Sequence, residues 1–151
     1  MKYRTTNEWN HFEFSEAYVS EIRRTNDSYQ LVLDNVMINP ENSKNRDIRQ
    51  MRANELYVTI CQAQLVRIVQ EGYKVYNADG KLIKQYEDQE IEPERYGEIV
   101  TTVNDGESRI YAFNKSGQTY EIIMEAGDER TYVLYITGTG DTEEWNRFLS
   151  V

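Results

Sequence analysis

Cysteine and histidine are almost missing from this chain, which has one of each among its 151 residues. A single cysteine, Cys61, excludes an internal disulfide and any metal site built from several cysteines. His11 has no second histidine near it, so the H-E-x-x-H zinc motif is absent. A catalytic triad would need His11 to meet Cys61 or a serine in three dimensions. We therefore expect no catalytic residue, no metal and no cofactor.

Long apolar runs are also missing. The longest, Tyr132–Ile136, is far shorter than the roughly 20 residues of a membrane-spanning helix. The N-terminus has no apolar run of signal-peptide length, so we expect a cytoplasmic protein. Positive charge is scarce too, because 17 Lys and Arg against 26 Asp and Glu give a net charge of -9. This charge argues against binding to nucleic acid or to an anionic membrane.

What is present suits one β-rich domain over residues 1–151. Of the aromatic residues, 12 are tyrosines, which favour strands and half-exposed sheet faces. Turn formers recur at regular spacing, for example at 77–80, 104–106 and 114–117, which indicates antiparallel strands. The predicted strands are 12–14, 18–24, 28–38, 56–60, 65–76, 81–86, 99–103, 109–113, 119–124 and 131–137.

The central prediction is a long strand that begins at Ser28. Apolar residues alternate up to Leu33 and resume out of phase at Val36. One extra residue in a β-bulge at Asp34-Asn35 would place both apolar sets on the same side of the sheet.

The end of the chain, Asp141–Leu149, has the pattern of a short helix. Asp141 and Glu144 match a capping box, and Trp145 begins an apolar stripe that must pack on the sheet. The predicted fold is therefore an antiparallel sandwich or part-open barrel of about eight to ten strands with a short C-terminal helix.

Two segments superficially suggest ligand sites. Gly138-Thr139-Gly140-Asp141 is similar to a phosphate-binding loop, but it lacks a third glycine and acidic residues crowd it. The acidic run at 87–94 lacks the spacing of a calcium loop, and Pro93 forbids a central strand there. We interpret it as a solvated, mobile connection.

The nearest candidate for a functional site is the segment Asn39–Arg52. Asn39 and Pro40 could start a helix of two or three turns, or the segment could be a long structured loop. On a helix Arg46, Arg49 and Arg52 would form a stripe able to hold an acidic segment of another protein or another copy of this chain. Asn42 is a fourth candidate binding residue. The structural alternative is that the arginines pair with the protein's own acids and that asparagines, Asn42 among them, cap the backbone.

Four stretches carry a resemblance: WNHFEF, LVLDNVMINPENSKNRDIRQMR, EGYKVYNADGKL and EEWNRFL. With them the chain resembles an uncharacterised family of small acidic bacterial proteins, some labelled as subtilin biosynthesis sensors. The chain has neither the histidine domain nor the ATP-binding domain of a sensor kinase, and the resemblance implies no site. A weaker similarity is to pleckstrin-homology-like domains, which end in a strand and a Trp-bearing helix, as expected here for residues 131–149.

The leading functional hypothesis is a non-enzymatic cytosolic binding or regulatory protein, such as an immunity protein, that acts through its surface on another protein. The alternative is a small-ligand carrier with a hollow barrel. A filled core with an exposed aromatic or charged patch would favour the binding protein, and a hollow centre with inward tyrosines would favour the carrier.

Overall fold

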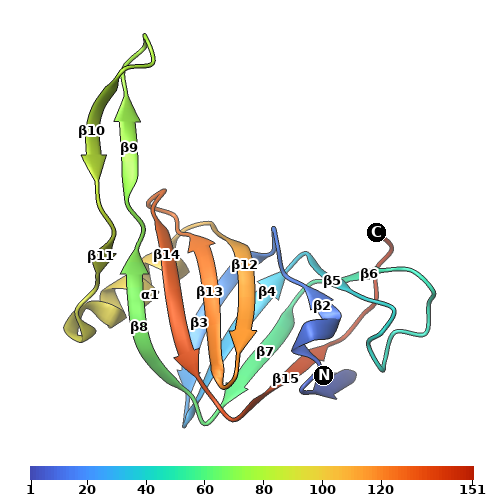
Figure 1. The fold of residues 1–151 in the computed structure, drawn as a ribbon. Helices are drawn as coiled ribbons and strands as arrows, with labels where there is room; N and C mark the ends of the chain where they lie inside the picture. The colour runs from blue at the N-terminus through green and yellow to red at the C-terminus, as the bar shows by residue number, and fades with distance from the viewer.

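The computed structural model describes all 151 residues and consists of antiparallel strands, one α-helix and two 3-10 turns (Figure 1). The strands are β1 (Tyr3–Thr6), β2 (Phe12–Glu13), β3 (Tyr18–Thr25), β4 (Ser28–Asp34), β5 (Val36–Ile38), β6 (Met51–Ala53), β7 (Leu56–Cys61), β8 (Gln64–Gln70), β9 (Tyr73–Tyr76), β10 (Leu82–Tyr86), β11 (Gln89–Glu90), β12 (Ser108–Ser116), β13 (Thr119–Glu125), β14 (Thr131–Thr137) and β15 (Gly140–Trp145). The helix is α1 (Tyr96–Asp105), and the 3-10 turns are η1 (Trp9–His11) and η2 (Pro93–Arg95).

Ten strands form one antiparallel sheet in the order β1-β15-β7-β4-β3-β12-β13-β14-β8-β11. The end strands β1 and β11 do not pair with each other, so the sheet is not closed into a barrel. Two small sheets, β9-β10 and β2-β5-β6, complete the fold. The mainly β, antiparallel architecture expected from the sequence is confirmed.

The large sheet turns a corner where two chain segments bend together. The segment β7–β8 pairs with the segment β15–β14 on both sides of the bend. At the corner the Thr139 amide donates to the Cys61 carbonyl at 2.9 Å. A Cβ atom on Gly138 would lie 2.4 Å from Ile60 Cγ2 and 2.9 Å from the Cys61 oxygen, so only glycine fits. In Figure 1 the strands β12, β13 and β14 accordingly lie in front of β3 and β4.

Side chains from the folded-over sheet fill the space inside it. The inward positions alternate along each strand, as in β7, where Leu56, Val58 and Ile60 are fully buried. Aromatic rings fill the region under β15. Phe12 and Phe14 lie 6.0 Å apart between ring centroids, and Phe113 packs on Phe14 at 4.8 Å. Each fully buried side chain of this size stabilises the fold by roughly 1.5–3 kcal/mol.

The central strand occupies the expected place, because β4 lies between β3 and β7. The expected irregularity also occurs, at Asn35, which adopts a positive φ of 61°. It separates two sheets, however, and is not a bulge within one. The continuation β5 pairs with β2 and β6, and Leu33 and Val36 are both buried as expected.

Residues 99–103 were expected to be a strand, and this prediction is wrong because they lie in α1. The run of β-branched residues favours a strand locally, but Ile99 and Val103 are four residues apart and both buried, as on a helix face. The side chain of Asn104 then pairs with the backbone of Ile22, donating to its carbonyl at 2.9 Å and accepting from its amide at 2.7 Å. Packing against β3 therefore decides the conformation.

The C-terminal helix is also a wrong prediction, because β15 occupies this part of the chain. Asp141, Glu143 and Trp145 follow a two-residue period and all point into the fold. The strand also removes the feature on which the similarity to pleckstrin-homology-like domains depended. The expected burial of Trp145 is confirmed, and its ring stacks on Tyr3 at a centroid distance of 5.7 Å.

The connection at 87–94 is more ordered than expected. It contains β11, where Glu90 forms an ion pair with Arg67 at 2.7 Å, and then η2. Ile91 is buried, whereas residues 87–90 are exposed as expected. None of the helical segments is long and apolar enough to cross a membrane.

Candidate functional site

Residues 39–50 form a structured loop and contain no helix, so the loop alternative is the one that the structure confirms. The two ends of the loop meet, because Ile38 and Met51 are paired residues of β5 and β6. A compact surface loop with adjacent ends is an Ω-loop, a type that often carries function.

Asn45 holds the two sides of this loop together. Its buried side-chain amide donates to the carbonyls of Ile38, Asn39 and Arg49 at 3.0, 3.2 and 3.2 Å. Its side-chain oxygen accepts a hydrogen bond from the amide of Asp47 at 2.9 Å. A short polar side chain thus replaces the backbone pairing that a helix or strand would provide.

Asn42 has a similar role at the first turn. It is almost fully buried, and its side-chain oxygen accepts from the amide of Lys44 at 2.9 Å. Its own amide donates to the Asn39 carbonyl at 3.0 Å, and its carbonyl accepts from the Asn45 amide at 3.1 Å. The side chain of Asn42 thus caps the backbone of this turn and does not face solvent, and its side-chain amide nitrogen has no hydrogen-bond partner.

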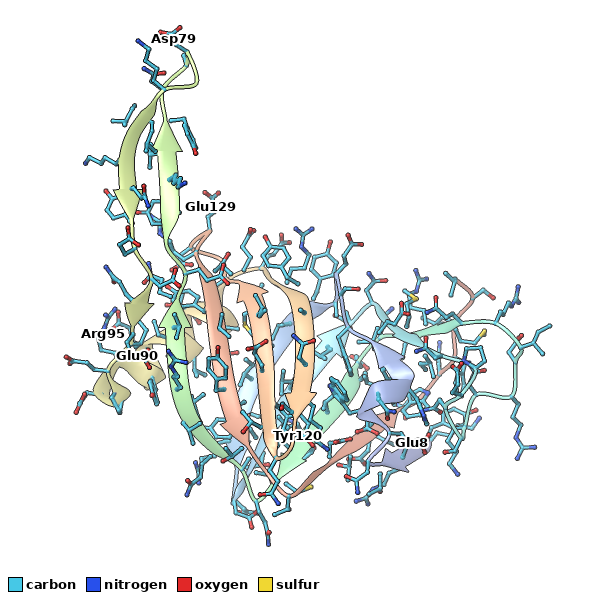
Figure 2. All side chains as sticks on the ribbon, viewed as in Figure 1. Glu8, Asp79, Glu90, Arg95, Tyr120 and Glu129 are labelled. Carbon is cyan, nitrogen blue, oxygen red and sulfur yellow. The ribbon has the colours of Figure 1, made fainter.

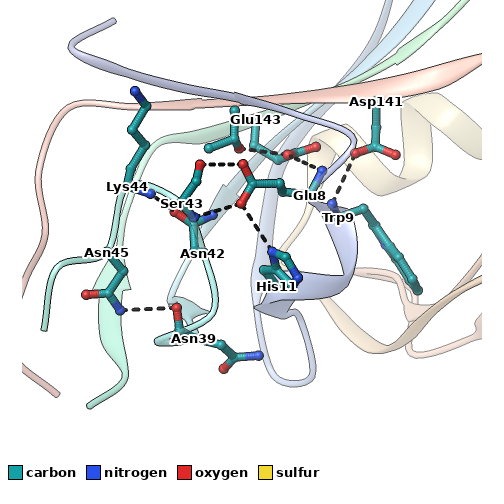
Figure 3. A network of polar contacts seen from close by, with 11 residues as sticks. Glu8, Trp9, His11, Asn39, Asn42, Ser43, Lys44, Asn45, Asp141 and Glu143 are labelled. Carbon is teal, nitrogen blue, oxygen red and sulfur yellow. Dashed lines mark hydrogen bonds and ion pairs between the residues drawn. The ribbon is translucent and has the colours of Figure 1, made fainter. Parts of the chain in front are cut away.

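Glu8, which precedes η1, attaches the loop to the rest of the protein (Figure 3). One carboxylate oxygen accepts from the Ser43 amide at 2.8 Å and contacts His11 Nδ1 at 3.1 Å. The other oxygen accepts from the Ser43 hydroxyl. Burial alone would raise the pKa of Glu8, but the hydrogen bonds from Ser43 and His11 hold it below its ordinary value.

The arrangement of Ser43, Glu8 and His11 does not match a catalytic triad. In a triad the histidine lies between the serine and the acid, so that it can remove the hydroxyl proton. Here Glu8 lies in the middle and binds both side chains. No hydrogen bond joins His11 to Ser43 or to Cys61, whose thiol contacts the Thr59 carbonyl. The three residues form a structural contact that fixes the loop.

The N-terminal segment that carries Glu8 is itself attached to β15. The side chain of Asp141 accepts from the Trp9 amide at 3.2 Å, and its backbone carbonyl accepts from the Asn7 amide at 2.8 Å. Glu143 accepts from the Glu8 amide at 3.3 Å and from the Thr5 hydroxyl at 2.8 Å. The two acids therefore connect the N-terminal segment to the sheet (Figure 3).

The three predicted arginines do not form one stripe. Arg46 is exposed and borders a shallow depression beside Lys44 and Phe148. Arg49 is exposed and lies 3.6 Å from Asp47, an ion pair within the loop.

Arg52 lies on β6 and borders a different groove, which it shares with Tyr18, Asp34 and Arg147. That groove has a volume of about 1030 Å³. The structure thus brings Arg46 and Arg49 into one exposed loop and separates them from Arg52.

Ile48 is the residue that sequence reasoning missed. Its side chain is 96% exposed at the tip of the loop, between Arg46 and Arg49. Ile48 and Met51 lie three residues apart, a spacing that the helix alternative for this segment would place on one side. Its exposed fraction is the highest among the large apolar side chains of the protein.

Comparisons with protein families, with curated proteins and with solved structures find no match to this chain. The candidate site therefore depends on its own geometry.

Proposed function

We propose that this protein is a non-enzymatic cytosolic binding protein that receives an acidic segment of another protein on the loop at residues 39–50. One observation carries this proposal. The loop is fixed by buried asparagines and presents an exposed isoleucine, Ile48, between two exposed arginines, Arg46 and Arg49.

The chemistry of the loop tip suits an acidic partner with an apolar side chain. Guanidinium groups match carboxylates in charge and geometry, and Ile48 offers an apolar contact between them. The chain as a whole is strongly acidic, with a net charge of -9, so a positively charged loop is a local exception that an acidic partner can recognise.

Rigidity supports the proposal as well. A loop that is already ordered loses little conformational entropy when it binds, which increases affinity for a given set of contacts. Asn45 and Glu8 supply this order from opposite sides of the loop.

The carrier hypothesis is less well supported. It needs a part-open barrel with a hollow centre, whereas a continuous cluster of buried side chains fills this folded-over sheet, which is nearer to a sandwich. Tyr120 and Trp145, the two largest fully buried side chains, belong to that cluster. A filled core with charged and aromatic groups at the surface favours a surface-binding protein.

The test uses a fluorescently labelled peptide in which aspartates flank a leucine, with binding followed by anisotropy at low salt. We expect wild-type protein to bind it, and R46Q/R49Q and Ile48→Ser each to weaken binding about tenfold or more. The control is R24Q/R147Q, which removes two exposed arginines outside the loop. Equal binding by wild type and both loop variants, or loss only in the control, contradicts the proposal.

A further inference from the structure

The hairpin at Tyr73–Tyr86, here called the arm, projects away from the rest of the protein (Figure 1). It consists of β9 and β10, which form a two-stranded sheet of their own. Every residue from Lys74 to Tyr86 is exposed, and Figure 2 shows Asp79 at the far tip. The outer edges of both strands are unpaired.

The arm is nevertheless well formed at both ends. At its base the rings of Tyr73 and Tyr86 stack at 4.4 Å, and the guanidinium of Arg130 lies 4.0 Å from the centre of the Tyr73 ring. At its tip the side chain of Asn77 accepts from the amides of Asp79 and Lys81 at 2.9 and 3.0 Å. The arm is therefore held in one direction.

Between these ends the arm exposes a set of large apolar side chains. Their exposed fractions lie between 38% and 57%. The residues are Val75, Tyr76, Leu82 and Ile83. An isolated two-stranded hairpin has marginal stability in water, and exposed apolar groups of this number mark a surface that another molecule covers.

The charge of the arm indicates what covers it. Lys74, Lys81 and Lys84 against Asp79 give the arm a charge of +2, so the other residues sum to -11 within the total of -9. The body of this chain is thus the kind of acidic surface that complements its own arm.

Two arms laid against each other would instead bring lysines together, which is destabilising. A contact in which each arm lies on the partner's body also satisfies twofold symmetry, because it occurs twice.

We propose that the arm binds the acidic body of a second copy of this chain and so forms a twofold dimer. The contact uses the exposed apolar side chains of the arm together with its three lysines. It is independent of the loop at residues 39–50, so either proposal can fail without the other.

The test measures the oligomeric state of the full chain by sedimentation velocity over a concentration series up to about 100 µM. We expect a monomer–dimer equilibrium that weakens when salt rises to about 0.5 M, because screening reduces the attraction between arm and body. Leu82→Ser with Ile83→Ser, and separately K81E/K84E, should each weaken dimerisation about tenfold or more. Circular dichroism checks that each variant is folded, which we expect because these side chains lie outside the core.

The matched control is K2E/R24E, which reverses two exposed positive charges outside the arm and should leave the dimer intact. A zero-length carbodiimide reagent, applied to mixed light and heavy isotope-labelled chains, should join arm lysines to carboxylates of the other copy. A wild-type protein that is monomeric throughout overturns the proposal. The proposal is also overturned if both arm variants dimerise with the same affinity as the wild-type protein.

Discussion

Asp141 and Glu143 lie two positions apart on β15, and both carboxyl groups are buried, with 1% and 0% of each residue exposed. The hydroxyl of Tyr120 donates to Asp141 at 2.6 Å, and the Lys115 ammonium lies 3.8 Å from the same oxygen. One oxygen of Glu143 has no hydrogen-bond partner. Burial, followed by the interaction with the neighbouring Asp141, raises the pKa of Glu143 to about 9.

The first prediction is a dependence of stability on pH that originates at Glu143. Its folded pKa of about 9 lies above the ordinary value of 4.5, so the folded state holds a proton that the unfolded state has lost. Its contribution is therefore fully present below pH 4.5 and is lost as the pH rises towards 9.

The measurement is urea unfolding of wild type and Glu143→Gln from acid to alkaline pH. Glutamine keeps the shape of the protonated acid and can donate to Asp141, so the variant should gain stability over wild type as the pH rises. Parallel stability curves for the two proteins would show that the pKa of Glu143 is the same in the folded and the unfolded state.

The second prediction concerns the corner of the sheet. Gly138→Ala places a Cβ atom against the backbone and side chain of β7, and we expect a loss of roughly 1–3 kcal/mol. Gly97→Ala is the control, because no atom lies within 4 Å of its added Cβ and it stands on α1. There alanine should stabilise the protein by about 0.5–1 kcal/mol. Thermal unfolding of both variants measures these changes. A Gly138→Ala protein with the same midpoint as wild type would mean that the corner is not tightly packed.

The third prediction concerns Trp145, whose ring lies between Tyr3 and Phe12 at centroid distances of 5.7 and 5.6 Å. Trp145→Ala should lower the free energy of unfolding by roughly 3–5 kcal/mol. Ile48→Ser, at a fully exposed position, should change it by less than about 0.5 kcal/mol. Chemical denaturation checks both, and a Trp145→Ala midpoint equal to that of wild type is the contrary result.

The fourth prediction concerns Asn45, which closes the loop through three backbone carbonyls. Asn45→Ala leaves those carbonyls without this donor and should reduce stability by about 1–3 kcal/mol. Amide hydrogen exchange should then accelerate at residues 46–50 more than in β4. If amide hydrogen exchange accelerated equally over the whole protein, the stabilising effect of Asn45 would not be confined to the loop.

Local patterns in the sequence predicted the β architecture, the central strand and the hairpin at 77–80, because alternation and turn residues act over short distances. The wrong predictions concern segments whose conformation depends on contacts with residues far away in the sequence. Asp141 was read as a helix cap, but its partners Tyr120 and Trp9 come from other strands and from the N-terminus.

The candidate site was predictable only in part, for the same reason. The sequence indicated the excess of positive charge and the capping asparagines. It did not indicate that Asn45 and Glu8 would hold Ile48 outward, because Glu8 is far from the loop along the chain. Without that contact the sequence left both a short helix and a structured loop open for this segment.

The most direct test of the proposed binding surface is a titration of ¹⁵N-labelled protein with the same acidic peptide, followed by amide chemical shifts. The binding proposal predicts that the perturbed amides cluster at residues 44–50, and that R46Q/R49Q removes the perturbation. Perturbations that centre on another surface, such as the groove beside Arg52, would contradict it.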